Sequence, residues 1–229
     1  MPRSVSARPT LPDQDVRLSV DTIVFALEGE QLRVLLVKRP VEPFAGREAI
    51  PGGFVESNES LDAAAARILD AETGLRDVYL EQLYTFGEPN RDPRGRVVTV
   101  SYIALVRPPA PTPRDGRWVP MGSLGPLAFD HARILEFALQ RLRYKLEYSP
   151  VGFRLLPQAF TLRGVQNAYE TILGRPLDKR NFRRKLLSLK VLKPLARSAR
   201  EGPHRPARLY RFEEDKWEGL REKGNVFVF

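Results

Sequence analysis

Five basic side chains in the first half of the chain are suited to binding phosphate. They come from two segments, the end of an apolar run and a polar loop further along: Lys38, Arg39, Arg91, Arg94 and Arg96. A guanidinium group donates paired hydrogen bonds to phosphate oxygens, and an aromatic ring such as Phe86, at the edge of the same loop, suits a nucleobase. We therefore predict a pocket for an anionic nucleotide. The alternative is a solvent-exposed hairpin loop whose arginines hold no ligand.

A second group of basic residues, in the last third of the chain, has the pattern of a nucleic-acid-binding surface. Phe182, Leu186 and Leu189 predict the buried side of a helix that starts at Asp178. The residues expected to contact DNA lie elsewhere on this helix, at the start of the preceding helix and in the following hairpin: Thr161, Lys179, Arg180, Asn181, Arg183, Arg184, Lys185, Arg205 and Arg208. A solvated basic face is the alternative, but fourteen basic residues against three acidic ones over 161–212 favour nucleic-acid binding.

The net charge of +9 is unevenly divided along the 229 residues. Residues 1–149 carry 19 Lys and Arg against 20 Asp and Glu, whereas residues 150–229 carry 18 against 8. This distribution predicts a basic module behind a nearly neutral domain.

Composition excludes several kinds of site. The chain has no cysteine, and therefore no disulfide, thiolate metal site or cysteine nucleophile. The only two histidines, His131 and His204, lack partners in the sequence, and we assign them no role. No stretch approaches the roughly 18 apolar residues of a membrane span, and the first residues lack a signal-peptide pattern. We expect a cytoplasmic protein without a membrane partner.

Strands and helices alternate around the first basic group. Apolar runs from Val20 and Gln31 predict a hairpin. Further strands are predicted at residues 78–86, 96–106 and 118–121. Helical spacing predicts one helix from Leu61, ended by Gly74, and a later one with Asp130 as its N-cap. This order is typical of an α/β domain.

Proline and glycine interrupt the pattern at residues 149–157, where we predict a linker. We expect a disordered arm at 1–17, a ligand-sensing domain at 18–148 and a DNA-binding domain at 158–229. In the last of these, a helix from Thr161, a break at Gly174, the basic helix and a basic hairpin follow the order of a winged helix-turn-helix. The basic helix would enter the major groove and the hairpin would reach phosphates or the minor groove. No interleaved aromatic platform is evident, so we expect duplex DNA and not RNA.

Residues 53–75 resemble the Nudix box, GX5EX7REUXEEXGU, in which U is a bulky aliphatic residue. The matching positions are Gly53, Glu59, Arg67, Leu69, Glu72, Gly74 and Leu75. This resemblance implies a Nudix α/β/α sandwich with a mixed sheet, and it adds Gly53 and Glu72 to the expected ligand-binding residues. Residues 85–96 further resemble the ADP-ribose-binding branch of the family.

Two metal-binding positions of the box have lost their carboxylates. The family's REUXEE reads RILDAE here, so Ile68 and Ala71 replace two glutamates and only Glu72 remains. Hard cations such as Mg²⁺ need several oxygen ligands, so we predict no metal site, no catalytic residue and no enzyme activity. The alternative is an ADP-ribose pyrophosphatase with a basic accessory domain. Ile68 also lies on the apolar stripe of its helix, so a role in the hydrophobic core would by itself explain an isoleucine at this position.

A degenerate Nudix domain followed by a basic winged helix is similar to the Nudix-related transcriptional regulators of NAD metabolism. The resemblance covers the chain from about Val20 to Phe212. It implies a homodimeric repressor that binds a palindromic DNA operator, with ADP-ribose or a related NAD metabolite as its effector and no required cofactor. Some relatives regulate sugar-utilisation genes instead.

Overall fold

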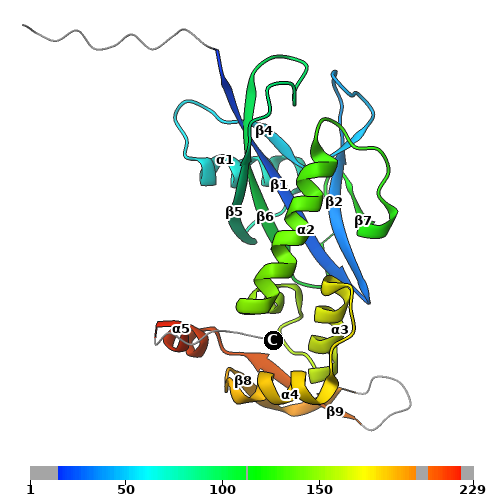
Figure 1. Cartoon of the computed structure of the whole chain (residues 1–229), viewed down its shortest axis with the longest axis vertical. Coiled ribbons are helices and arrows are strands. Elements are labelled where there is room, and N and C mark those ends of the chain that lie inside the picture. The colour runs from blue at the N-terminus through cyan, green and yellow to red at the C-terminus, as the bar shows by residue number, and fades with distance from the viewer. Residues whose placement is uncertain (1–14, 112, 200–205, 223–229) are drawn as a thin grey trace, which may run out of the picture.

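The computed structural model describes residues 15–111, 113–199 and 206–222. Figure 1 shows two parts stacked along the long axis, which we call the sheet domain, up to Tyr148, and the winged helix domain, from Pro150. The expected fold class, an α/β/α sandwich with a mixed sheet followed by a winged helix-turn-helix, is confirmed. Within the described residues, no helix has the length and apolarity to cross a membrane.

Seven strands of the sheet domain form one mixed sheet in the order β3-β2-β1-β6-β5, with β4 on β1 and β7 on β2. The strands are β1 (Arg17–Glu28), β2 (Gln31–Lys38), β3 (Glu48–Ala49), β4 (Gly52–Phe54), β5 (Tyr79–Phe86), β6 (Val97–Val106) and β7 (Arg117–Pro120). β1 pairs antiparallel with β2 and parallel with β6. It is buried along nearly its whole length because both faces of the sheet are covered, which explains its continuous apolar run.

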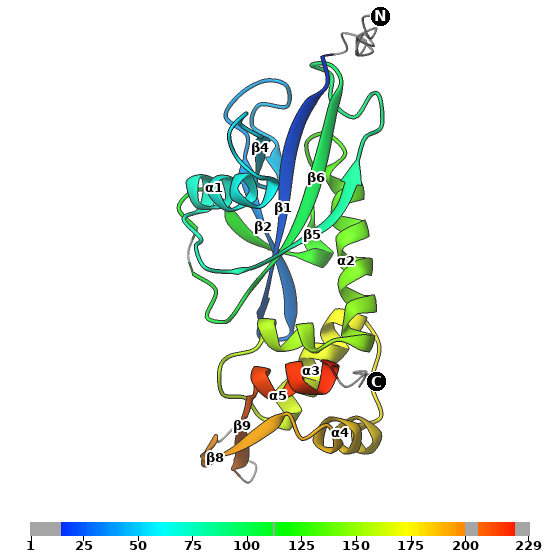
Figure 2. The same ribbon diagram turned by 90° about the vertical axis from the view of Figure 1, so that its left-hand side faces the viewer.

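Two helices cover the sheet, α1 (Leu61–Thr73) on one face and α2 (His131–Tyr148) on the other, as Figure 2 shows. Gly74 ends α1 in the left-handed conformation, φ 77°, as predicted. A short 3-10 helix, η1 (Met121–Ser123), lies between β7 and α2. Asp130 stands at the N-cap position of α2, but its side chain does not cap the helix as we expected. It is turned instead toward an arginine of the polar loop, described below.

Residues 149–157, predicted to be a linker, contain a 3-10 helix, η2 (Pro150–Leu155), that packs into the junction between the domains. Its apolar side chains share one core with α2 and the winged helix domain: Val151, Phe153 and Leu155. Two polar contacts also cross the junction: Arg143 Nε donates to the carbonyl oxygen of Ile172 at 2.8 Å, and Asn167 Nδ2 to Glu30 Oε1 at 3.3 Å. Proline and glycine interrupt regular helical spacing, yet the apolar residues between them are still buried.

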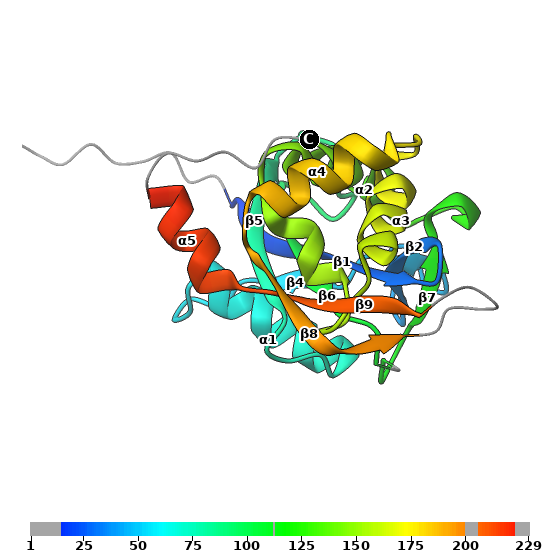
Figure 3. The same cartoon turned by 90° about the horizontal axis from the view of Figure 1, so that it is seen from below.

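The winged helix domain contains two helices, a ribbon and a further helix. Its elements are α3 (Leu162–Leu173), α4 (Lys179–Ser188), β8 (Leu192–Ala199), β9 (Ala207–Phe212) and α5 (Glu214–Glu222). Gly174, at φ 71°, ends α3 before the turn to α4. α5 was not expected from the sequence. Seen from below in Figure 3, α4 and the β8-β9 ribbon occupy the same end of the molecule.

Candidate functional site

A pocket of about 120 Å³ opens in the sheet domain beside β1 and β4. It is lined by Ser19, Asp21, Arg39, Ile50, Gly52, Gly53, Phe54, Arg91, Asp92, Arg94, Phe129 and His131. Four of the predicted ligand-binding residues, Arg39, Gly53, Arg91 and Arg94, therefore lie together on its wall. Fixed cations, carboxylates and two aromatic rings give the pocket the groups that recognise a nucleotide.

Arg91 is held in the pocket wall by two carboxylates. Its Nε and Nη2 donate to Asp130 at 3.0 and 2.7 Å, and Nη2 lies 3.4 Å from Asp21 Oδ2. The Arg91 side chain is only 4% exposed. Arg91 thus holds Asp21 and Asp130 in place. Because these carboxylates already balance its charge, Arg91 is not a free cation for a ligand.

Arg39 and Arg94 both lie against the ring of Phe129. Their guanidinium carbons are 4.6 and 5.4 Å from the ring centroid, and that of Arg94 is also 5.1 Å from the centroid of Phe54. Arg94 pairs with Asp92 through bonds of 3.0 and 2.7 Å. Arg39 donates to backbone carbonyls and forms no ion pair within the described chain. Partial burial and the neighbouring Arg94 lower the pKa of Arg39, and both unfavourable effects would be relieved by a bound anion.

His131 and Glu72 add titratable groups around Asp21 and β4. Burial lowers the pKa of His131, and its Nδ1 accepts a hydrogen bond from Ile50 N at 3.0 Å. The imidazole is therefore neutral, with its proton on Nε2, 3.8 Å from Asp21 Oδ1. Burial also raises the pKa of Glu72 to about 7, while Glu72 Oε2 accepts a hydrogen bond from Gly52 N at 3.0 Å. Glu72 thus supports the β4 backbone from outside the pocket lining.

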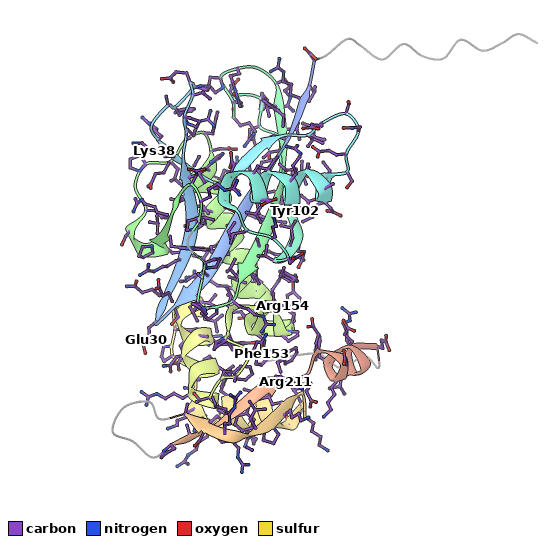
Figure 4. The ribbon with its side chains drawn as sticks, turned by 180° about the vertical axis from the view of Figure 1, so that it is seen from behind. Glu30, Lys38, Tyr102, Phe153, Arg154 and Arg211 are labelled. Carbon is purple, nitrogen blue, oxygen red and sulfur yellow. The ribbon has the colours of Figure 1, made fainter. Side chains whose placement is uncertain are left out.

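Besides Glu72, three predicted ligand-binding residues do not line this pocket. Lys38 is exposed at the end of β2, as Figure 4 shows, and Arg96 is exposed and donates to the carbonyl oxygen of Gly87 at 2.6 Å. We were wrong to expect Phe86 to face a nucleobase, because it is buried and packs edge-on against Phe137 at 5.6 Å. The accessible rings are those of Phe54 and Phe129.

Sequence reasoning missed most of the pocket's other polar and aromatic residues. His131 does have partners, contrary to our expectation, while His204 lies outside the described residues. Only Asp21 carried a local signal, because it is the single charged residue in the apolar run 20–27. Phe54, Phe129 and Asp130 reach the pocket through the fold, and the sequence around them gave no sign of it.

The helix of the Nudix-like box does not present a metal-binding face. Ile68 packs on Gly53, where an added Cβ would lie 3.1 Å from Ile68 Cδ1, and Ala71 is exposed. Glu59 accepts a hydrogen bond from Arg67 Nε at 2.8 Å, so its carboxylate is already paired. In the described chain, no three acidic or histidine side chains gather as potential metal ligands. The residues present do not fit a divalent cation.

Exposed basic side chains and the amide of Asn181 lie on α4 and the ribbon at one end of the molecule, and together we call them the α4-wing surface. Its members are Lys179, Arg180, Asn181, Arg184 and Lys185 on α4 and Lys193, Arg197, Arg208 and Arg211 on β8 and β9. Phe182 and Leu186 bury the opposite side of α4, and Asp178 caps the helix by accepting a hydrogen bond from Asn181 N at 2.7 Å. Figure 3 shows both elements facing outward at this end. Such a surface is complementary to the phosphates and major groove of duplex DNA.

Three predicted DNA-binding residues differ from the rest. We were wrong about Thr161, because its side chain is buried and caps α3 by accepting a hydrogen bond from Gly164 N at 2.9 Å. Arg183 is partly buried, and its Nε has no hydrogen-bond partner among the residues that the structure describes. Arg205 lies outside the described residues. The sequence predicted that the hairpin would contact DNA, but it did not indicate three of its basic residues, Lys193, Arg197 and Arg211.

Two family models match the chain. The NUDIX domain covers residues 16–138 and the NrtR DNA-binding winged helix domain covers residues 152–212. An ADPR responsive transcriptional repressor, NtrR, from Acinetobacter baylyi is 39% identical over 204 residues, which are 85% of this chain and 81% of the relative.

Solved structures agree with these matches. The Shewanella oneidensis NrtR complexed with a 27mer DNA has a TM-score of 0.80 and 37% identity, covering 88% of this chain and 95% of its own. The NUDIX domain of the same protein complexed with ADP ribose has a TM-score of 0.52 and 39% identity, covering 56% of this chain and 90% of its own.

Proposed function

The chain belongs to the Nudix family, in the branch that continues into an NrtR-type DNA-binding winged helix, and from this premise we propose that it is an ADP-ribose-responsive transcriptional repressor. The winged helix domain binds duplex DNA, and the sheet domain binds ADP-ribose or a related NAD metabolite. One observation carries this proposal: the chain combines a pocket lined by three arginines, beside a Nudix box that lacks two of its metal-binding glutamates, with the α4-wing surface.

In this proposal the effector occupies the pocket by exchanging ion pairs. Arg39 contacts the diphosphate first because it has no carboxylate to release, and Arg94 exchanges Asp92 for a phosphate oxygen. The rings of Phe54 and Phe129 offer faces for the base. The pocket of about 120 Å³ is below the ~300–1,000 Å³ of most ligand sites. Entry of the effector therefore requires the loops that carry Arg94 and Phe129 to move apart.

α2 connects this movement to the DNA-binding domain. The helix starts at the pocket, where Arg91 holds Asp130, and its 18 residues span about 27 Å. Near its other end, Arg143 holds the carbonyl oxygen of Ile172 in α3. A ligand that displaces the loop at Phe129 shifts the start of α2, and the rigid helix transmits the shift to α3. The effector can change DNA affinity only by binding the two arrangements unequally.

The operator is proposed to be palindromic and the protein a homodimer. A winged helix monomer reads one half-site, and two recognition helices separated by about one turn of DNA read both. On this basis the effector alters the separation or tilt of the two α4 helices. The regulated genes are proposed to serve NAD metabolism, since the effector is derived from NAD. A repressor acts where its DNA lies, so we propose a cytoplasmic protein.

We further propose that the protein is not an enzyme and requires no cofactor. Ile68 and Ala71 support this proposal, because both stand where a Nudix hydrolase has a metal-binding glutamate. The alternative is an ADP-ribose pyrophosphatase, which the retained Glu59 and Glu72 favour. Incubation with ADP-ribose and Mg²⁺ or Mn²⁺ separates the two, because rapid release of AMP would establish the alternative.

Fluorescence anisotropy with DNA from upstream of the protein's own gene tests the repressor. We expect specific binding that weakens steeply with salt, as phosphate contacts require, and a changed affinity when ADP-ribose is added. An unrelated duplex of equal length is the matched control. Equal affinity for both duplexes, or a flat salt response, would contradict the proposal. In an Arg39→Ala variant, DNA binding should remain while the response to ADP-ribose is lost.

A further inference from the structure

A groove of about 680 Å³, distinct from the pocket described above, lies between the sheet domain and the winged helix domain. β5, the end of β6 and the last turns of α2 form one side, and η2, the end of β9 and α5 form the other. Figure 4 labels Phe153 and Arg154 at this level, where the two domains meet. The volume lies within the ~300–1,000 Å³ of typical small-molecule sites.

The groove has more cations than its carboxylates can balance. Five basic residues line it, namely Arg107, Arg141, Lys145, Arg154 and Arg221, against three acidic ones, namely Glu81, Glu214 and Glu218. Lys145 pairs with Glu81 and Arg154 with Glu214. The other three basic residues form neither an ion pair nor a hydrogen bond with any described residue, which leaves uncompensated positive charge on the walls.

Arg107, which directly follows β6, is the clearest case. Partial desolvation and the nearby guanidinium of Arg154 both lower its pKa. Glu214 balances Arg154, but no described carboxylate pairs with Arg107, so the two guanidinium groups still repel each other. An anion placed between them would remove this repulsion. Arg154 is itself fixed, because it also lies 5.5 Å from the ring centroid of Tyr79.

Aromatic rings accompany these charges. Tyr148, on the last turn of α2, is 43% exposed and lines the groove. The floor is rigid, because Phe153 and Phe212 stack with centroids 4.4 Å apart. An accessible ring beside free guanidinium groups suits a planar ligand that carries a phosphate.

We propose that this groove is a second ligand site, which binds a small phosphorylated aromatic compound of the mononucleotide class. The site is independent of the effector pocket, since the two share no lining residue. A ligand there contacts both domains at once and stabilises one arrangement of the junction. Inorganic phosphate would satisfy the arginines alone, whereas a mononucleotide would also use Tyr148.

Trp217 provides a reporter for the test. It lines the groove from α5, and the only other tryptophan is Trp118 in β7. A full-length Trp118→Phe protein is titrated with AMP, adenosine and inorganic phosphate while its fluorescence is followed. We expect a saturable change with AMP at lower concentration than with phosphate, and no comparable change with adenosine.

Variants in the same background locate the binding. Arg107→Ala should weaken AMP binding roughly tenfold or more, the effect of losing a charge-assisted hydrogen bond. Arg133→Ala, at an exposed arginine outside the groove, is the matched control and should change nothing. Arg39→Ala, in the effector pocket, should also leave the signal intact, and Tyr148→Ala should weaken AMP binding more than phosphate binding.

Three results would overturn the proposal: no saturable change with AMP, loss of the signal in Arg39→Ala but not in Arg107→Ala, or equal affinity for AMP and phosphate. The second would place the nucleotide in the effector pocket only, and the third would reduce the groove to a phosphate site. Failure of DNA binding or of the response to ADP-ribose leaves these readouts unaffected.

Discussion

Replacing Arg91 by methionine should destabilise the sheet domain severely. The variant keeps the apolar part of the side chain but removes the guanidinium that holds Asp21 and Asp130, whose side chains are 9% and 16% exposed. Breaking a buried ion pair by removing one partner costs about 3–5 kcal/mol, because a buried charge is left uncompensated. The pocket admits some water to these carboxylates, so we expect about 3 kcal/mol, or a fall in melting temperature of roughly 10 °C.

Calorimetry and urea unfolding measure this loss. Arg96→Met is the matched control, because Arg96 belongs to the same loop but is exposed and makes one bond to a backbone carbonyl. Its cost should stay below about 1 kcal/mol. Adding Asp130→Asn to Arg91→Met should recover part of the stability, since it removes one of the uncompensated carboxylates. If Arg91→Met costs no more than Arg96→Met, the account of Arg91 as a structural cation is refuted.

Three further predictions concern the DNA surface, the α3 cap and the buried glutamate. Arg184→Ala and Lys185→Ala should each weaken DNA binding and reduce its salt slope by about one in anisotropy titrations, while calorimetry should find ADP-ribose binding unchanged. Thr161→Ala should cost about 1 kcal/mol in urea unfolding through loss of the cap, and a loss of DNA affinity in the folded variant would instead show that Thr161 contacts DNA. Burial raises the pKa of Glu72 from its usual 4.5 to about 7 in the folded protein, so the folded state binds the proton more tightly than the unfolded state. Protonation of Glu72 therefore stabilises the folded protein at low pH, and this stabilisation is lost as the pH rises from about 5 through 7. Urea unfolding should therefore show Glu72→Gln gaining stability relative to the unmodified protein between pH 5 and pH 8, and a constant difference would contradict the raised pKa.

The fold was predictable because its signals are local. The apolar runs of β1 and β2, the glycine that ends α1 and the spacing of the Nudix-like box all lie within short stretches of sequence. The basic residues of α4 could likewise be assigned to an exposed face, since Phe182 and Leu186 fix which side of the helix is buried. The buried packing of η2 was missed because six residues with proline and glycine show no helical period.

The pocket was only half predictable because its partners are distant in the sequence. Arg91 meets Asp21 across 70 residues and Asp130 across 39, and no pattern within the polar loop indicates either. Phe86 was mistaken for a base-binding ring because its place beside the loop was visible, whereas the side chains packed around it were not. Thr161 was expected to contact DNA because it stands at the start of α3, whereas its buried side chain caps that helix.

The ion pairs of the pocket determine how its arginines can respond to a bound anion. If all three guanidinium groups were free, an anion would bind without disturbing the protein and the effector would have no reason to alter DNA affinity. Two of them are instead bound to carboxylates, and Asp130, one partner of Arg91, stands at the start of α2. In the proposed mechanism, a phosphate takes Arg94 from Asp92 and moves the loop that also carries Arg91, the partner of Asp130, and this displacement at the start of a rigid helix is transmitted to α3 at its other end. Loss of the metal-binding glutamates is consistent with this role, because a regulator must release its effector unchanged when the effector concentration falls.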